Sequence, residues 1–270
     1  MNPSPRSQTR KIDMSHTPVL DRLRAQAAGA SRPEPPLCKI CGGATRPAFA
    51  LPSAKLTGQP IPAADNDCTY YECSVCRFLF STLHDAIDHG ALYGDDYWAN
   101  QDPDWGGRVN QTLRLVLMAN KLLGMDPWTL KVLDFGCGMG TFVQAARDQL
   151  QLQAFGTDII KPRFGLEWFQ PKPEGGSFDA VVSCEVLEHL PQPFEILSRA
   201  KSYLRPGGVL AFQTAEYDPK ACGRDWWYLG PANGHISLYS RDAFDVLAER
   251  LGVVDKLCWN GYAGLQAWKF

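Results

Sequence analysis

The chain has 270 residues, of which 45% are hydrophobic and 21% are charged, and its formal net charge is −2. This length is enough for one well-buried domain and a small accessory one. The nearly balanced charge gives no reason to expect nucleic acid or an anionic membrane as a partner. No apolar stretch approaches the ~20 residues that cross a bilayer, and residues 1–10 lack the apolar core of a secretory signal. We therefore expect a cytoplasmic protein, and its oligomeric state stays open.

The N-terminal part contains two Cys-x-x-Cys pairs. Residues 1–36, rich in Pro, Ser, Arg and Gln, predict a disordered leader. Four thiolates satisfy tetrahedral zinc, and a redox dithiol is the alternative. Residues 37–82 thus predict a small zinc-ribbon-like module with strands at 69–72 and 77–80, in which the metal supplies folding energy. The predicted zinc ligands are Cys38, Cys41, Cys73 and Cys76.

The remainder alternates between strand and helix patterns. Residues 83–126 predict a linker and a substrate-side helical segment, with a helix over 109–123. From residue 127 the alternation predicts an α/β, doubly wound Rossmann-like catalytic domain whose ligand site lies at the C-terminal ends of parallel strands. The expected strands are 131–135, 154–157, 178–183 and 209–213, and the expected helices are 141–150, 194–204 and 241–251. A turn is expected at 205–208, and a terminal hairpin at 253–259 and 265–270.

A glycine-rich turn, Asp-Phe-Gly-Cys-Gly-Met-Gly at 134–140, follows the first predicted strand of this domain and opens a helix. Its third glycine comes one residue earlier than in a dinucleotide-binding turn. Asp134 would repel a diphosphate but suits a cationic amino-acid group. Asp158 ends the second strand, where a carboxylate can accept hydrogen bonds from ribose hydroxyls. Two acids without a phosphate cradle favour an adenosine that carries an amino acid over a turn with no ligand.

These motifs, together with Ser-Phe-Asp-Ala-Val-Val-Ser-Cys-Glu-Val-Leu-Glu-His-Leu and Leu-Arg-Pro-Gly-Gly-Val-Leu, resemble class I S-adenosylmethionine-dependent methyltransferases over residues 130–214. The similarity is greatest to the small-molecule branch that includes the ubiquinone-biosynthesis O-methyltransferases. The resemblance implies that Asp134 and the glycine backbone hold the methionine portion, Asp158 the ribose, and Cys184 and Glu185 the pocket wall. The expected cofactor-binding residues are Asp134, Phe135, Gly136, Cys137, Gly138, Gly140, Asp158, Ile159, Cys184 and Glu185.

One segment departs from the family. Between Asp158 and Phe178 such enzymes usually fit a helix, a strand and their loops, and here three prolines interrupt a stretch with little room for turns. The sequence therefore predicts a shortened crossover, with no clear counterpart of the polar residue that the family often places near the adenine.

The segment Glu-Val-Leu-Glu-His at 185–189 follows the third strand, at the expected substrate edge. Methyl transfer is an in-line displacement, and a hydroxyl acceptor must lose its proton, for which histidine is suited near neutral pH. The resemblance implicates His189 as the base, with Glu188 orienting it. A purely structural role before Pro191 is the alternative. His235 is a second candidate, in a loop with Trp226, Trp227 and Tyr228. This loop either forms an acceptor pocket or makes only a hydrophobic lid contact.

Three functions follow for testing. The first is O-methylation of a small-molecule or sugar hydroxyl with S-adenosyl-L-methionine as cofactor and Zn²⁺ in the N-terminal module. The second is C-methylation of a nucleotide-linked keto-sugar, because a zinc module ahead of this catalytic domain is similar to the arrangement in sugar C-methyltransferases. The third is a zinc-dependent binding or scaffold protein with a degenerate methyltransferase fold, which the shortened crossover motivates.

Overall fold

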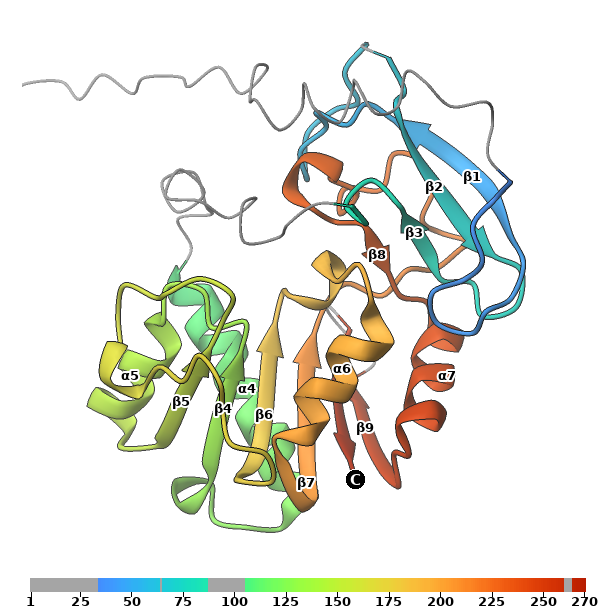
Figure 1. Cartoon of the computed structure of the whole chain (residues 1–270). Coiled ribbons are helices and arrows are strands. Elements are labelled where there is room, and N and C mark those ends of the chain that lie inside the picture. The colour runs from blue at the N-terminus through green and yellow to red at the C-terminus, as the bar shows by residue number, and fades with distance from the viewer. Residues whose placement is uncertain (1–33, 64, 87–104, 260–263) are drawn as a thin grey trace, which may run out of the picture. The chain divides into compact units, whose positions relative to one another are not determined.

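The computed structural model describes residues 34–63, 65–86, 105–259 and 264–270 (Figure 1). Residues 34–270 form one compact unit. Most of the predicted leader and the part of the predicted linker at 87–104 lie outside the described residues. Among the residues described, no helix is both long and apolar enough to span a bilayer.

The larger sheet has six strands in the order β5-β4-β6-β7-β10-β9. The first four strands of this order run parallel, and β10 pairs antiparallel with both β7 and β9. The predicted terminal hairpin is therefore confirmed as β9 and β10. The bounds are β4 (Lys131–Phe135), β5 (Gln153–Thr157), β6 (Phe178–Cys184), β7 (Leu204–Gln213), β9 (Asp255–Trp259) and β10 (Leu265–Lys269).

Helices cover both faces of this sheet, as a doubly wound fold requires (Figure 1). Because side chains alternate along a strand, Val132 packs with helices α4 and α5, and Leu133 packs with α6 and α7. The helices are α4 (Trp105–Leu123), α5 (Thr141–Leu150), α6 (Pro193–Ser202) and α7 (Arg241–Leu251). The expected helices at 141–150 and 241–251 agree with the structure residue for residue.

The crossover from β5 to β6 is short, as the sequence predicted. It contains a single 3₁₀ turn, η3 (Leu166–Trp168), and no α-helix among these described residues. Phe169 forms an isolated parallel bridge with Gly156, and the Gln170 amide donates to the Gly156 carbonyl at 2.8 Å. One bridge thus stands beside β5, where a full crossover would add a further strand.

The prediction of a turn at 205–208 is wrong. Strand β7 begins at Leu204 and runs through these residues, and the pairing with β6 is irregular between Phe178 and Ala180. Gly207 has φ +78°, a conformation that glycine adopts readily. The Arg-Pro-Gly-Gly sequence is therefore accommodated as an irregularity within the strand.

A second sheet of four antiparallel strands has the order β1-β2-β3-β8. Its strands are β1 (Thr45–Leu51), β2 (Cys68–Cys73), β3 (Leu79–Ser81) and β8 (Ser237–Leu238). The sequence predicted strands at the positions of β2 and β3 and missed the other two. Strand β8 comes from the C-terminal half of the chain and pairs with β3, so this sheet joins the cysteine-rich segment to the region before α7. The domain boundaries at 37–82 and 127–270 remain predictions.

Candidate cofactor and acceptor site

The glycine turn lies where the chain reverses its order in the sheet. Strand β4 pairs with β5 on one side and β6 on the other, which is the position where doubly wound folds bind ligands. Gly136, Gly138 and Gly140 all have positive φ, at 79°, 54° and 80°. A Cβ on Gly140 would lie 2.2 Å from the Phe164 carbonyl oxygen, so the short crossover packs directly against the turn. The Phe164 amide also donates to the Met139 carbonyl at 2.9 Å.

Two carboxylates lie beside this turn. Asp134 is buried within β4, and burial, with a contribution from the Asp158 charge, raises its pKa to about 8. A cation placed next to Asp134 would favour the ionised form. Asp158 follows β5 and accepts hydrogen bonds from the amides of Gly138 (2.8 Å) and Ile160 (3.1 Å). Its carboxylate therefore faces the turn, and burial raises its pKa despite these bonds.

The other predicted cofactor residues divide into two groups. The side chains of Phe135 and Cys137 are largely buried and pack in the two core clusters on opposite faces of the sheet. Ile159 is 59% exposed just beyond Asp158. Cys184, at the end of β6, donates its thiol to the Gln111 side chain of α4 at 3.6 Å. Helix α4 therefore borders this edge of the sheet.

Glu185 has φ +54°, in the left-handed region that few residues other than glycine adopt. Its side chain accepts hydrogen bonds from the Tyr228 hydroxyl at 2.9 Å and from the Gln213 amide at 3.3 Å. The Thr214 and Tyr228 hydroxyls are 3.3 Å apart. These contacts join the end of β6, the end of β7 and the loop that carries Tyr228 into one polar cluster.

Glu188, His189 and His235 form a second cluster next to it. Glu188 and His189 belong to a 3₁₀ turn, η4 (Leu187–His189), and one carboxylate oxygen of Glu188 lies 3.7 Å from His189 Nε2. The two imidazole rings meet edge to face with centroids 4.9 Å apart. One nitrogen or oxygen atom from each of the three residues lies within 4.8 Å of the others, so the three side chains form one compact cluster.

Burial dominates the electrostatics of both clusters. Desolvation, together with the Glu188 charge, raises the pKa of Glu185 to about 8. Burial also raises the pKa of Glu188, whose side chain is fully inside the protein. His235 is neutral near pH 7 because burial and the neighbouring His189 lower its pKa well below 6.5. The Arg108 charge on α4 lowers the pKa of both carboxylates.

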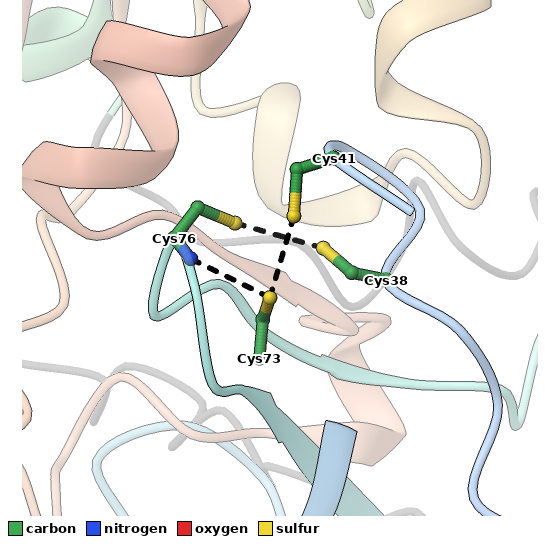
Figure 2. A group of neighbouring side chains, drawn as sticks. All are labelled: Cys38, Cys41, Cys73 and Cys76. Carbon is green, nitrogen blue, oxygen red and sulfur yellow. Dashed lines mark hydrogen bonds between the residues drawn. The ribbon is translucent and has the colours of Figure 1, made fainter. Parts of the chain in front are cut away.

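The four predicted cysteine ligands come together, and their sulfurs point toward a common centre (Figure 2). All four sulfurs lie within 4.8 Å of one another, with 3.6 Å between Cys38 and Cys76 and 3.4 Å between Cys41 and Cys73. Tetrahedral zinc with Zn–S bonds of about 2.3 Å separates its sulfurs by roughly 3.8 Å. None of the four forms a disulfide.

The two cysteine turns have the same backbone geometry. The residue after each pair, Gly42 in the first and Arg77 in the second, has positive φ and donates its amide to the carbonyl of the first cysteine. Amides also donate to the sulfurs, from Ile40 to Cys38 and from Val75 to Cys73, each at 3.4 Å. Such bonds orient and stabilise thiolate ligands. The donor set and its surroundings therefore fit a structural zinc ion.

The structure adds residues that the sequence did not suggest. Arg108 and Gln111 reach the site from α4. A buried lysine, Lys55, contacts the loop that carries Tyr228. Neither helix position carries a motif, and a single lysine in a loop has no distinctive spacing. Their roles depend on segments that lie far apart in the chain.

A mostly parallel sheet covered on both faces, with a glycine turn and two acids at its switch point, defines the chain as a member of the Rossmann-like class of folds. The family model described as a methyltransferase domain matches residues 101–255, and the chain belongs to this family of class I S-adenosylmethionine-dependent methyltransferases.

Individual relatives agree with this assignment. The chain is 27% identical over 160 residues to a ubiquinone biosynthesis O-methyltransferase from Xanthomonas axonopodis, covering 52% of the chain and 65% of the relative. It is 30% identical over 151 residues to a tRNA U34 carboxymethyltransferase from Idiomarina loihiensis, covering 46% of each. It thus spans between about half and two thirds of these relatives' lengths.

A solved structure shares the fold. The 1,6-didemethyltoxoflavin-N1-methyltransferase of Burkholderia thailandensis, crystallised with bound 1,6-didemethyltoxoflavin and S-adenosylhomocysteine, aligns over 77% of the chain and 97% of its own length. The TM-score is 0.51 and the sequence identity is 14%.

Proposed function

We propose that this chain transfers a methyl group from S-adenosylmethionine to a hydroxyl of a small molecule or sugar. The observation that carries the proposal is the contact between buried Glu188 and His189, beside His235, at the same strand edge as the glycine turn. The similarity to an enzyme named an O-methyltransferase supports a hydroxyl acceptor.

The cofactor would be held by residues of the β4–α5–β5 unit. Asp134 would pair with the ammonium of the methionine portion. The amides and carbonyls of the glycine turn would contact its carboxylate and amino groups. Asp158 would accept hydrogen bonds from the ribose, and Ile159 would cover the adenine. When bound, the cofactor supplies the methyl group as an electrophile.

The acceptor proton would pass to His189. The buried Glu188 carboxylate, 3.7 Å from His189 Nε2, would stabilise the imidazolium that forms. His235 presents Nδ1 to the Tyr228 carbonyl at 2.8 Å, an arrangement that holds a proton on Nδ1 and leaves Nε2 as the basic atom. His235 is therefore the second candidate for the base.

The test compares His189→Gln and His235→Gln with His84→Gln, a matched change at a buried histidine that follows β3. Transfer of a radiolabelled methyl group to a panel of phenols and nucleotide-linked sugars should fall by about 100-fold in His189→Gln. Cofactor affinity measured by calorimetry should stay within twofold in all three variants. Unchanged transfer in His189→Gln contradicts the base assignment. Absence of S-adenosylmethionine binding by the native chain would favour a scaffold protein.

We also propose that Cys38, Cys41, Cys73 and Cys76 hold one structural zinc ion. The sulfur–sulfur separations, which are close to those around a tetrahedral zinc ion, and the amide–sulfur hydrogen bonds in both cysteine turns support this assignment. Elemental analysis of the purified chain should find one zinc per molecule, and Cys73→Ser should lose it. Metal-free protein that remains folded to the same temperature would count against a structural ion.

C-methylation of a keto-sugar is the second candidate, and the packing of the cysteine-rich segment against the loop that carries His235 favours it. In that reaction the base removes a carbon-bound proton. A nucleotide-linked keto-sugar incubated with the enzyme in D₂O without cofactor should then incorporate deuterium at the acceptor carbon. An O-methyltransferase gives no such exchange.

A further inference from the structure

The loop at 224–236, here called the acceptor loop, carries both Tyr228 and His235 and follows β7. A second loop, at 52–58 and here called the module loop, follows β1 within the cysteine-rich segment. These loops are far apart in the chain but lie against one another. Leu51, the last residue of β1, shares a core cluster with Tyr228 and Leu229 of the acceptor loop.

Backbone hydrogen bonds join the two loops. The Gly58 amide donates to the Trp227 carbonyl at 2.7 Å, and the Ala232 amide donates to the Lys55 carbonyl at 3.1 Å. The Thr57 amide donates to the Asn233 side chain at 2.7 Å. The bonds are distributed along the acceptor loop on both sides of Tyr228, so they restrain it at more than one point.

Lys55 is the central contact. Its side chain is almost fully buried, with 1% of the residue exposed, and its ammonium donates to the carbonyls of Leu229 and Leu56. Burial lowers its pKa. Placing an ammonium inside a protein is costly unless its hydrogen bonds are made, and Leu229 is the residue next to Tyr228. This lysine therefore joins the module loop to the backbone next to Tyr228, the residue that donates a hydrogen bond to Glu185.

The cysteine turns are themselves fastened to the catalytic part of the chain. Arg250 of α7 donates to the Ile40 carbonyl, between Cys38 and Cys41. Ser240, which caps α7, donates to the Cys76 carbonyl at 2.6 Å. The Tyr70 hydroxyl of β2 donates to the His235 carbonyl at 2.8 Å. Hydrogen bonds thus connect the four-cysteine cluster to α7, and the four-stranded sheet to the acceptor loop.

We propose that Lys55 is a positioning residue for the acceptor side of the reaction: it holds the acceptor loop so that Tyr228 meets Glu185 and His235 meets His189. The inference rests on the proposed function in taking these residues as the acceptor site. It assigns the cysteine-rich segment a role in shaping that site, in addition to any role in folding.

Amide hydrogen exchange of the full-length, zinc-loaded chain tests the proposal without a known acceptor. In Lys55→Met, which keeps the apolar stem and removes the ammonium, exchange over 224–236 should accelerate by about tenfold or more. Exchange in β4–β7, zinc content and S-adenosylmethionine affinity should stay as in the native chain. The matched control is Lys39→Met, because this buried lysine binds the Ser81 carbonyl and Asp85 instead.

A spectroscopic readout separates positioning from general destabilisation. In the native chain and in Lys39→Met, nitrogen-15 NMR should show His235 with its proton on Nδ1, bonded to Tyr228. In Lys55→Met this signal should broaden or be lost. Asn233→Ala, which removes the bond from Thr57, provides a milder second variant with the same expected direction.

Two results would overturn the proposal. One is a native rate of amide exchange over 224–236 in both Lys55→Met and Asn233→Ala, and the other is an acceleration of exchange that extends equally over β4–β7. Neither result depends on methyl transfer. Failure of the proposed function, seen as full turnover in His189→Gln or as no cofactor binding, is therefore distinguishable from failure of this inference.

Discussion

The proposed cofactor side and the proposed acceptor side of the site are built in different ways. The proposed cofactor side uses one continuous βαβ unit, from Asp134 through the glycine turn to Asp158, whose parts contact one another directly. The proposed acceptor side joins His189, Tyr228 and His235 from separate segments, and two loops that are far apart in the chain hold it together. Glu185, an expected cofactor residue, lies between the two sides and accepts a hydrogen bond from Tyr228. Substitutions should therefore act locally on the first side and at a distance on the second.

The strongest test of the cofactor side is Asp134→Asn. Loss of a buried partner for the ammonium should weaken S-adenosylmethionine binding by about 100-fold in calorimetry. The cofactor-free protein should gain about 1–3 kcal/mol of stability at pH 7.5 in urea unfolding, since a buried carboxyl with a raised pKa is removed.

Asp179→Asn is the control for this change. Asp179 is also buried, but it pairs with Arg205 and accepts from the Lys131 amide at the opposite end of the strands. This variant should lose stability and keep native cofactor affinity. Equal cofactor affinity in the native chain and Asp134→Asn would break the proposed contrast between the two sides.

The pH dependence of cofactor binding is the next largest effect. The pKa of Asp134 is about 8 in the folded chain, above its ordinary 3.8, so the bound proton stabilises the cofactor-free fold most fully below pH 4, and this contribution is lost as the pH rises to about 8. Binding of the cationic cofactor should release this proton. Affinity should rise by up to tenfold per pH unit between about pH 6 and 8.

Calorimetry in two buffers of different ionisation enthalpy measures the released proton directly. The same titration with Asp134→Asn should show a flat profile below pH 7. A native affinity that is independent of pH over this range would mean that Asp134 is ionised before the cofactor binds.

The smallest expected effect is on the acceptor side. Tyr228→Phe keeps the ring and removes the hydroxyl that donates to Glu185, which should lower methyl transfer about tenfold and stability by about 1–2 kcal/mol. Cofactor affinity should not change by more than about twofold. Tyr217→Phe, on the segment that follows β7, should retain native transfer. A large loss of cofactor affinity in Tyr228→Phe would show that the two sides are not separable.

Local sequence pattern determined much of this protein: the alternation of strands and helices, the glycine turn with Asp134 and Asp158, the shortened crossover and the four cysteines that meet in space. These features depend on residues that are neighbours in the chain or that share one ligand, so spacing reveals them.

Only the tertiary structure decided how the cysteine-rich segment and the catalytic sheet are joined. Strand β8 has two residues and no pattern of its own, and it becomes a strand because β3 offers it hydrogen bonds. Arg108 and Lys55 reach the site only because α4 and the module loop pack there. Contacts between distant segments are determined by packing and by the need to satisfy buried polar groups, and a linear sequence does not display these by spacing.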